Sequence, residues 1–129
     1  MPAIDGSCLC GAVRVTVARM PRKLTQCNCS TCRRSGALLA YYRRKQVTVT
    51  GELDEYMRRP RGLRFRRCAT CGCFVCWEWK RDAEARMGVN ARLLDPEAMA
   101  NVPISVLDGA RSWRVLEKYK KPHLWLSPG

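Results

Sequence analysis

The chain has 129 residues, 47% hydrophobic and 27% charged, which is the composition of one folded domain. No apolar stretch approaches the ~20 residues of a membrane helix, and the N-terminus lacks the basic and apolar regions of a signal peptide. We therefore expect a cytoplasmic protein without a membrane segment. The net charge of +13, mostly Arg, predicts an anionic partner such as nucleic acid or a small acidic metabolite, although part of it can offset buried thiolates.

Short alternating segments separated by turns predict a mainly β fold. In chain order, the expected strands are residues 12–18, 24–26, 38–43, 47–51, 53–57, 63–67, 74–79, 88–90 and 104–106. Helical turns are expected after Ser30, as N-cap, up to Gly36, and around Pro96. Trp113 is interpreted as a core anchor, and residues 116–129 as a basic tail without evident chemistry.

Three cysteines lie within six residues, at Cys27, Cys29 and Cys32. The first two share a face if the chain is extended, and the last two share a face of a helical turn. A strand that runs into a helical turn would direct all three sulfurs at one point, as around a zinc ion with one coordination position open. The only histidine, His123, is expected to be a surface residue rather than a fourth ligand.

Six further cysteines lie in three pairs. Cys8 and Cys10 form one knuckle, and Cys68 and Cys71 form a second, so that each pair supplies half of a tetrahedral zinc site. Nine cysteines in such short spacings, in a reducing compartment, favour metal over disulfides. The remaining two, Cys73 and Cys76, are interpreted as packing thiols, although the run from residue 68 to residue 76 could also hold a metal alone.

Arginines cluster in two places. Residues 58–67 contain a strand with a basic face, interpreted as a solvated edge strand protected by charge, with a ligand-facing patch as the alternative. Arg33 and Arg34 follow the three-cysteine motif directly. They can offset the charge of the thiolates or bind carboxylates of a ligand, and exposed residues without such a role are an equal alternative.

These motifs, in this order, resemble those of the glutathione-dependent formaldehyde-activating enzymes and centromere protein V. The resemblance rests on the cysteine knuckle in residues 6–11, the run from Cys27 to Ala37, the segment from Gly51 to Tyr56 and the knuckle in residues 67–72, and it spans about residues 6–115 of a single 1–129 domain. It implies the β-tent fold, made of several short antiparallel sheets stapled by zinc knuckles.

The resemblance also implies the metal and substrate sites. One structural zinc would be held by Cys8, Cys10, Cys68 and Cys71, and a second, which can be substoichiometric, by Cys27, Cys29 and Cys32. Glutathione and formaldehyde are the implied substrates and S-hydroxymethylglutathione the product. Asn28, which stands where many members have His, is a candidate substrate contact together with Arg33 and Arg34.

Three functions follow as hypotheses. The first is a zinc-dependent carbon–sulfur lyase or synthase that adds glutathione or a similar thiol to formaldehyde or another small aldehyde. The second is a non-catalytic, zinc-stapled basic module that binds nucleic acid or protein; the scarcity of Lys and the lack of exposed aromatic residues interleaved in the arginine run count against stacking on bases. A redox protein that uses C-x-x-C is the third, disfavoured because no βαβ pattern surrounds the motif.

Overall fold

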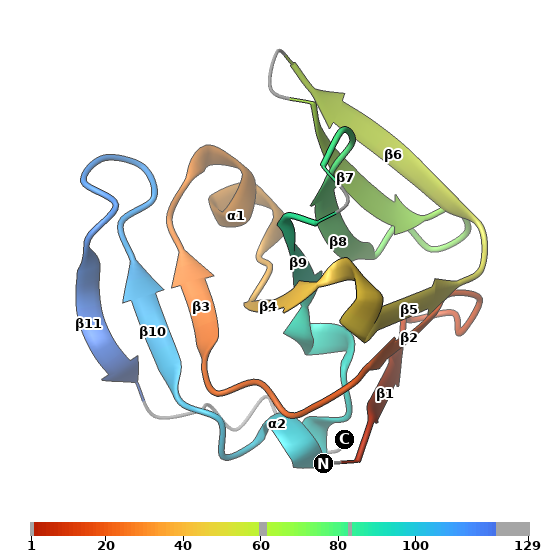
Figure 1. The fold of residues 1–129 in the computed structure, drawn as a ribbon, viewed down its shortest axis with the longest axis horizontal. Helices are drawn as coiled ribbons and strands as arrows, with labels where there is room; N and C mark the ends of the chain where they lie inside the picture. Colours follow the sequence, from red (N-terminus) through yellow and green to blue (C-terminus); the bar gives the residue numbers. More distant parts are fainter. Residues whose placement is uncertain (1, 60–61, 83, 121–129) are drawn as a thin grey trace.

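The computed structural model describes residues 2–59, 62–82 and 84–120, and its strands form two sheets (Figure 1). The strands are β1 (Ile4–Ser7), β2 (Arg14–Val17), β3 (Leu24–Cys27), β4 (Leu39–Arg43), β5 (Val47–Thr50), β6 (Leu53–Arg58), β7 (Leu63–Cys68), β8 (Phe74–Trp79), β9 (Arg86–Asn90), β10 (Ile104–Leu107) and β11 (Val115–Lys120). The helices are short: α1 (Ser30–Ser35), η1 (Arg44–Gln46), η2 (Ala91–Leu93) and α2 (Pro96–Met99). The predicted mainly β fold is confirmed.

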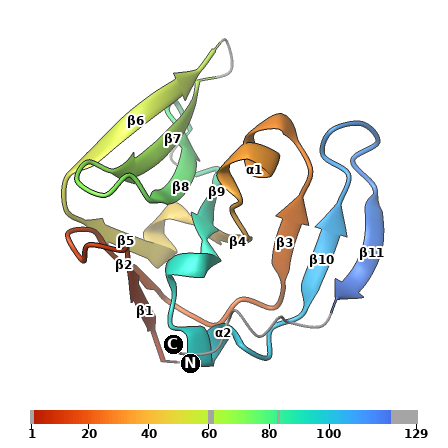
Figure 2. The same ribbon diagram turned by 180° about the vertical axis from the view of Figure 1, so that it is seen from behind.

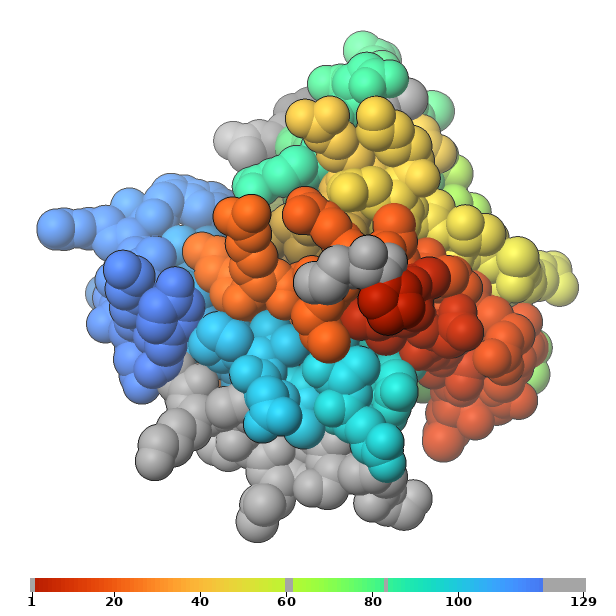
Figure 3. All heavy atoms as spheres, turned by 60° about the horizontal axis from the view of Figure 1, so that its bottom comes forward, coloured from red at the N-terminus to blue at the C-terminus, as the bar shows by residue number. Residues whose placement is uncertain are grey.

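The smaller sheet has the order β1-β2-β5 and is antiparallel throughout. The alternation around β2 buries Val13, Val15 and Val17 completely and leaves Arg14 exposed. Strand β1 also packs against the segment that leads into α2, and the amide of Asp95 donates to the carbonyl of Asp5 over 2.9 Å. Figure 3 shows this face, with β1 beside α2. The N-terminal strand therefore joins the smaller sheet to the rest of the core.

The larger sheet has the order β11-β10-β3-β4-β9-β8-β7-β6. Its neighbours pair antiparallel except β3 and β10, which are parallel. In the middle of this sheet Gly88 lies between Tyr41 and Trp77 on the neighbouring strands, and a Cβ there would overlap the Trp77 ring. The glycine lets these two rings meet edge to face at 6.0 Å.

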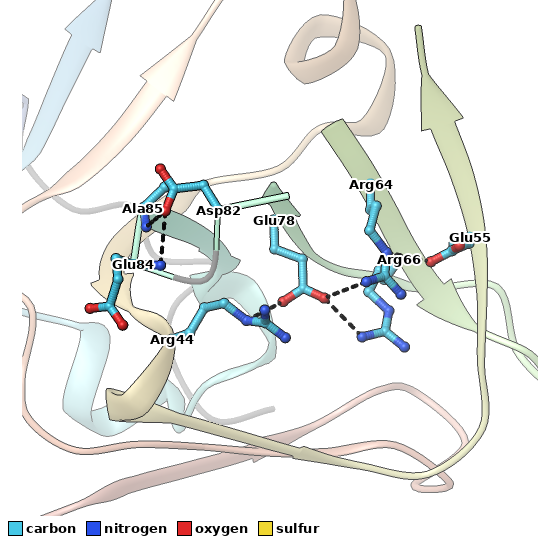
Figure 4. Close-up of polar contacts among 8 residues, drawn as sticks. All are labelled: Arg44, Glu55, Arg64, Arg66, Glu78, Asp82, Glu84 and Ala85. Carbon is cyan, nitrogen blue, oxygen red and sulfur yellow. Dashed lines mark hydrogen bonds and ion pairs between the residues drawn. The ribbon is translucent and has the colours of Figure 1, made fainter. Parts of the chain in front are cut away.

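A buried ion cluster joins β7 and β8 to η1 (Figure 4). Glu78 is only 5% exposed and accepts from Arg66 at 3.0 Å and Arg44 at 3.1 Å, with Arg64 at 3.6 Å. Two of these arginines belong to the arginine run of the sequence. Because β7 is bordered by β6 and β8, the interpretation of this segment as a solvated edge strand is wrong. The edge strand is β6, and Arg64 and Arg66 on one face of β7 pair with the buried carboxylate of Glu78.

Three further expectations are corrected. Trp113 is not a core anchor: it is 66% exposed, with a positive φ of 59°. The segment expected to begin a tail pairs with β10 as strand β11. The N-cap of α1 is Cys29 rather than Ser30, because the Cys29 sulfur accepts from the amide of Cys32, whereas Gly36 ends the helix as expected. Finally, no helix in the described part of the chain is long and apolar enough to cross a membrane.

Candidate metal centres

The two sequence-distant knuckles meet in space. Cys8 and Cys10 precede β2, Cys68 ends β7 and Cys71 follows it, yet their four sulfurs all lie within 4.8 Å of one another. The sulfurs of Cys8 and Cys10 are 3.6 Å apart and those of Cys10 and Cys68 are 3.7 Å apart. Four sulfurs at ~2.3 Å from a tetrahedral ion stand about 3.8 Å from each other. The spacing therefore fits a shared zinc ion, and all four cysteines are free thiols.

Backbone amides point at these sulfurs. Val13 donates to the sulfur of Cys8 over 3.3 Å, and Thr70 and Cys71 both donate to that of Cys68 over 3.4 Å. The amides of Cys73 and then Cys10 lower the pKa of Cys71 to about 5. Because hydrogen bonds to a charged sulfur favour the thiolate, the backbone is arranged for a metal-binding set of anions.

The three-cysteine motif has the predicted form of a strand that runs into a helical turn. Cys27 ends β3, Cys29 caps α1, and Cys32 lies within the helix. Their three sulfurs lie within 4.8 Å of one another, and no fourth His, Cys, Asp or Glu joins the group among the described residues. The donor set is all sulfur and leaves a coordination position open, which is the arrangement of a metal centre that accepts an outside ligand.

The three thiols differ in acidity. Burial opposes ionisation of Cys29, but the amide of Cys32, 3.3 Å from its sulfur, and the neighbouring thiols outweigh it and lower the pKa of Cys29. Burial and then the neighbouring sulfurs raise the pKa of Cys32, and burial is also the largest cause that raises the pKa of Cys27. Ionisation is thus favoured most at Cys29, and burial and the neighbouring sulfurs oppose it at Cys27 and Cys32.

The turn that follows β10 packs on this centre. A Cβ at Gly109 would overlap the sulfur of Cys27 and lie 3.3 Å from Cβ of Cys29. Asn28 fastens the turn: its amide nitrogen donates to Asp108 over 2.9 Å, and its oxygen accepts from the amide of Ala110 over 2.9 Å. Both ends of the Asn28 amide are thus engaged, which gives this residue a positioning role. This contact between the turn and the cysteines was not predicted from the sequence.

Two aromatic residues near the centre were not recognised from the sequence. The exposed Trp113 has a ring carbon 3.5 Å from the position of a Cβ on Gly109, and its left-handed backbone is a strained conformation of the kind found at functional sites. Tyr41 is half-buried; burial, followed by the charges that Cys32 and Cys27 carry once ionised, raises its pKa to about 12. Tyr41 therefore keeps its hydroxyl proton well above neutral pH.

The other predicted residues are placed as follows. Arg33 and Arg34 are exposed in the last turn of α1, and a side-chain nitrogen of Arg34 donates to the carbonyl of Ser30 over 3.0 Å. Cys76 is buried in the core, where burial is the first cause that raises its pKa to about 12, and Cys73 packs partly buried against the core. His123 lies outside the described residues.

The fold and the two sulfur clusters define a mainly β protein with cysteine-only candidate metal centres. The family model of the glutathione-dependent formaldehyde-activating enzymes matches residues 3–106, so the chain belongs to this family. A crystal structure of a Rhodobacter sphaeroides protein is similar, with a TM-score of 0.63 and 30% sequence identity over 78% of this chain and 99% of that one. No curated protein matches the sequence significantly.

Proposed function

We propose that this protein is a zinc-dependent carbon–sulfur lyase of the synthase type, which adds glutathione or a similar thiol to formaldehyde or another small aldehyde. The observation that carries the proposal is the cluster of Cys27, Cys29 and Cys32, whose sulfurs lie within 4.8 Å of one another without a fourth protein ligand among the described residues. Membership of the formaldehyde-activating family supports the choice of thiol and aldehyde.

Zinc suits both cysteine clusters, because thiolates are its typical ligands. At the three-cysteine cluster it would supply positive charge at an open position and so favour the thiolate form of an incoming thiol. We propose two zinc ions per chain, with the four-cysteine site structural and the three-cysteine site filled more completely when a thiol is present. The activity belongs in a reducing compartment such as the cytoplasm, where these cysteines stay free.

The reaction adds the elements of S–H across a carbonyl group. A carbon–sulfur bond forms, the electron pair of the carbonyl π bond moves to oxygen, and this oxygen takes up a proton, so no oxidant or reductant is required. In this proposal the hydroxyl of Tyr41, which keeps its proton because its pKa is raised to about 12, donates a hydrogen bond to the developing alkoxide.

Other side chains would hold the substrates. Arg33 follows Cys29 by four residues and so lies above it on the same face of α1, where its guanidinium can bind a carboxylate of the thiol. Trp113 provides an exposed ring beside Gly109 that can cover the aldehyde. Asn28 contributes by holding the turn that carries Gly109 and Trp113.

The test measures the adduct by nuclear magnetic resonance after rapid mixing of glutathione and formaldehyde with zinc-loaded protein. The proposal predicts that the wild type forms S-hydroxymethylglutathione faster than the protein-free mixture and that Cys29→Ser loses this acceleration. Tyr41→Phe should lower the rate about 10²-fold if the hydroxyl acts as a proton donor, with an unchanged zinc content. A wild-type rate equal to that of the blank would refute the enzymatic proposal.

A further inference from the structure

A cleft of about 830 Å³ lies on the side of α1 that faces away from the three cysteines. It opens between α1 and the β6–β8 part of the larger sheet, which face each other in Figures 1 and 2. Helix positions 30, 31, 34 and 35 line it, whereas Cys27, Cys29 and Cys32 do not. This division follows the helical period, since residues three and four apart share a face. The cleft is therefore separate from the three-cysteine centre.

The floor of the cleft is aromatic. Tyr56 on β6 and Phe65 on β7 are direct partners in the sheet, so their side chains stand next to each other on one face. The ring of Phe74 lies 6.2 Å from that of Phe65, tilted by 45°. Tyr56 is 63% exposed, so its ring is accessible to a ligand that enters the cleft. Phe65 belongs to the arginine run itself, and the strands on either side of β7 add Tyr56 and Phe74.

The walls of the cleft are cationic. Arg34, Arg58, Arg67 and Arg92 line it, from four different elements, and none of its lining residues is acidic. Arg58 donates to the hydroxyl of Thr31 over 3.3 Å and so ties β6 to α1. The nearest acidic partner of Arg67 is Asp54 at 4.0 Å, and both side chains are about half exposed, so the pair neutralises little charge.

We propose that this cleft binds a nucleoside phosphate, either free or as a unit of single-stranded nucleic acid. A planar base can stack on exposed aromatic rings of a sheet, and the adjacent arginines can bind its phosphate with paired N–H groups. A peptide-like thiol would use the arginines but leave the ring of Tyr56 uncovered. The net charge of +13 favours the same class of ligand. This site is independent of the proposed thiol chemistry.

The experiment measures fluorescence anisotropy of a labelled 12-nucleotide oligodeoxythymidine with zinc-loaded, full-length protein, with AMP and glutathione as competitors. Tyr56→Ala should weaken binding about tenfold, within the range for loss of one stacked base, and Tyr56→Phe should bind like the wild type. Arg67→Ala should weaken binding and lower the slope of log affinity against log salt by about one. The matched controls are Tyr119→Ala, a tyrosine 56% exposed on β11, and Arg14→Ala on β2; both should bind within about twofold of the wild type.

Two results would support the proposal and identify the source of the ligand. If AMP displaces the labelled oligonucleotide as well as unlabelled oligonucleotide does at the same concentration of nucleotide units, the ligand is a free nucleotide. If the unlabelled oligonucleotide competes much more strongly than AMP, the ligand is nucleic acid. Adduct formation from glutathione and formaldehyde should be unchanged in Tyr56→Ala, so failure here leaves the proposed enzyme activity intact. The proposal is overturned if the labelled oligonucleotide does not bind, if Tyr56→Ala and Tyr119→Ala bind alike, or if glutathione displaces the oligonucleotide.

Discussion

Removal of the Glu78 carboxylate should destabilise the fold far more than removal of a neighbouring surface carboxylate. Glu78 is 5% exposed and is the shared partner of three arginines, which are 24–38% exposed. Loss of one partner of a buried ion pair costs about 3–5 kcal/mol because charge of one sign is left behind. The partial exposure of the arginines places the expected cost of Glu78→Ala near the lower limit, at about 3 kcal/mol.

Glu55→Ala is the matched control. Glu55 pairs with Arg64, one of the same three arginines, at 2.8 Å, but it is 40% exposed. An exposed pair contributes at most about 1 kcal/mol. Glu78→Gln separates the effect of charge from that of volume, because it removes the charge and keeps the side-chain size. We expect it to show most of the destabilisation of Glu78→Ala.

The assay is urea unfolding of zinc-loaded protein, followed by tryptophan fluorescence, with midpoints compared at equal m-values. Destabilisation by Glu78→Ala that does not exceed that of Glu55→Ala would refute the reasoning. The ion cluster around Glu78 would then contribute no more to stability than a surface ion pair. It would also not be needed to hold β7, the strand that ends at Cys68 of the four-cysteine cluster.

Two further predictions concern the turn over the three cysteines. Gly109→Ala should retain about one zinc per chain where the wild type binds two, because its methyl group would overlap the sulfur of Cys27; Ala110→Ser should keep both, and equal zinc content in the two variants would contradict this. Asn28 is the largest cause that lowers the pKa of Asp108. The carboxylate therefore helps to hold the turn at neutral pH, and this contribution is lost as the pH falls through its lowered pKa. Nuclear magnetic resonance titration should show the pKa of Asp108 rising in Asn28→Ala, and an unchanged pKa would exclude this coupling.

The sequence predicted the parts of the fold that local chemistry determines. Alternation identified the strand around Val13, Val15 and Val17. Spacing identified both halves of the four-cysteine cluster, because a few residues of local sequence determine the positions of the two sulfurs in each knuckle. The helical turn around Pro96 was also predicted, and it forms α2, whose N-cap Asp95 accepts from the amide of Glu97 through its side chain.

The errors came from contacts between distant segments. Trp113 looked like a core residue because its size is evident in the sequence, whereas the turn that exposes it depends on Asn28, far away in the chain. Arginines on β7 looked solvated because their partner, Glu78, lies on the next strand. Tyr41 was placed in a strand correctly, but its contact with Trp77 depends on Gly88 of β9, which lies between the two residues in the sheet.

The central claim is that three sulfurs hold a zinc ion with a position open to an outside thiol. Zinc per chain, measured by mass spectrometry after extensive dialysis with and without glutathione, tests it most directly, in the wild type and in Cys29→Ser. The account predicts one firmly retained zinc in both proteins and a second that only the wild type binds, more completely when glutathione is present. A second zinc that persists in Cys29→Ser, or a wild type that binds one zinc under both conditions, would contradict the account.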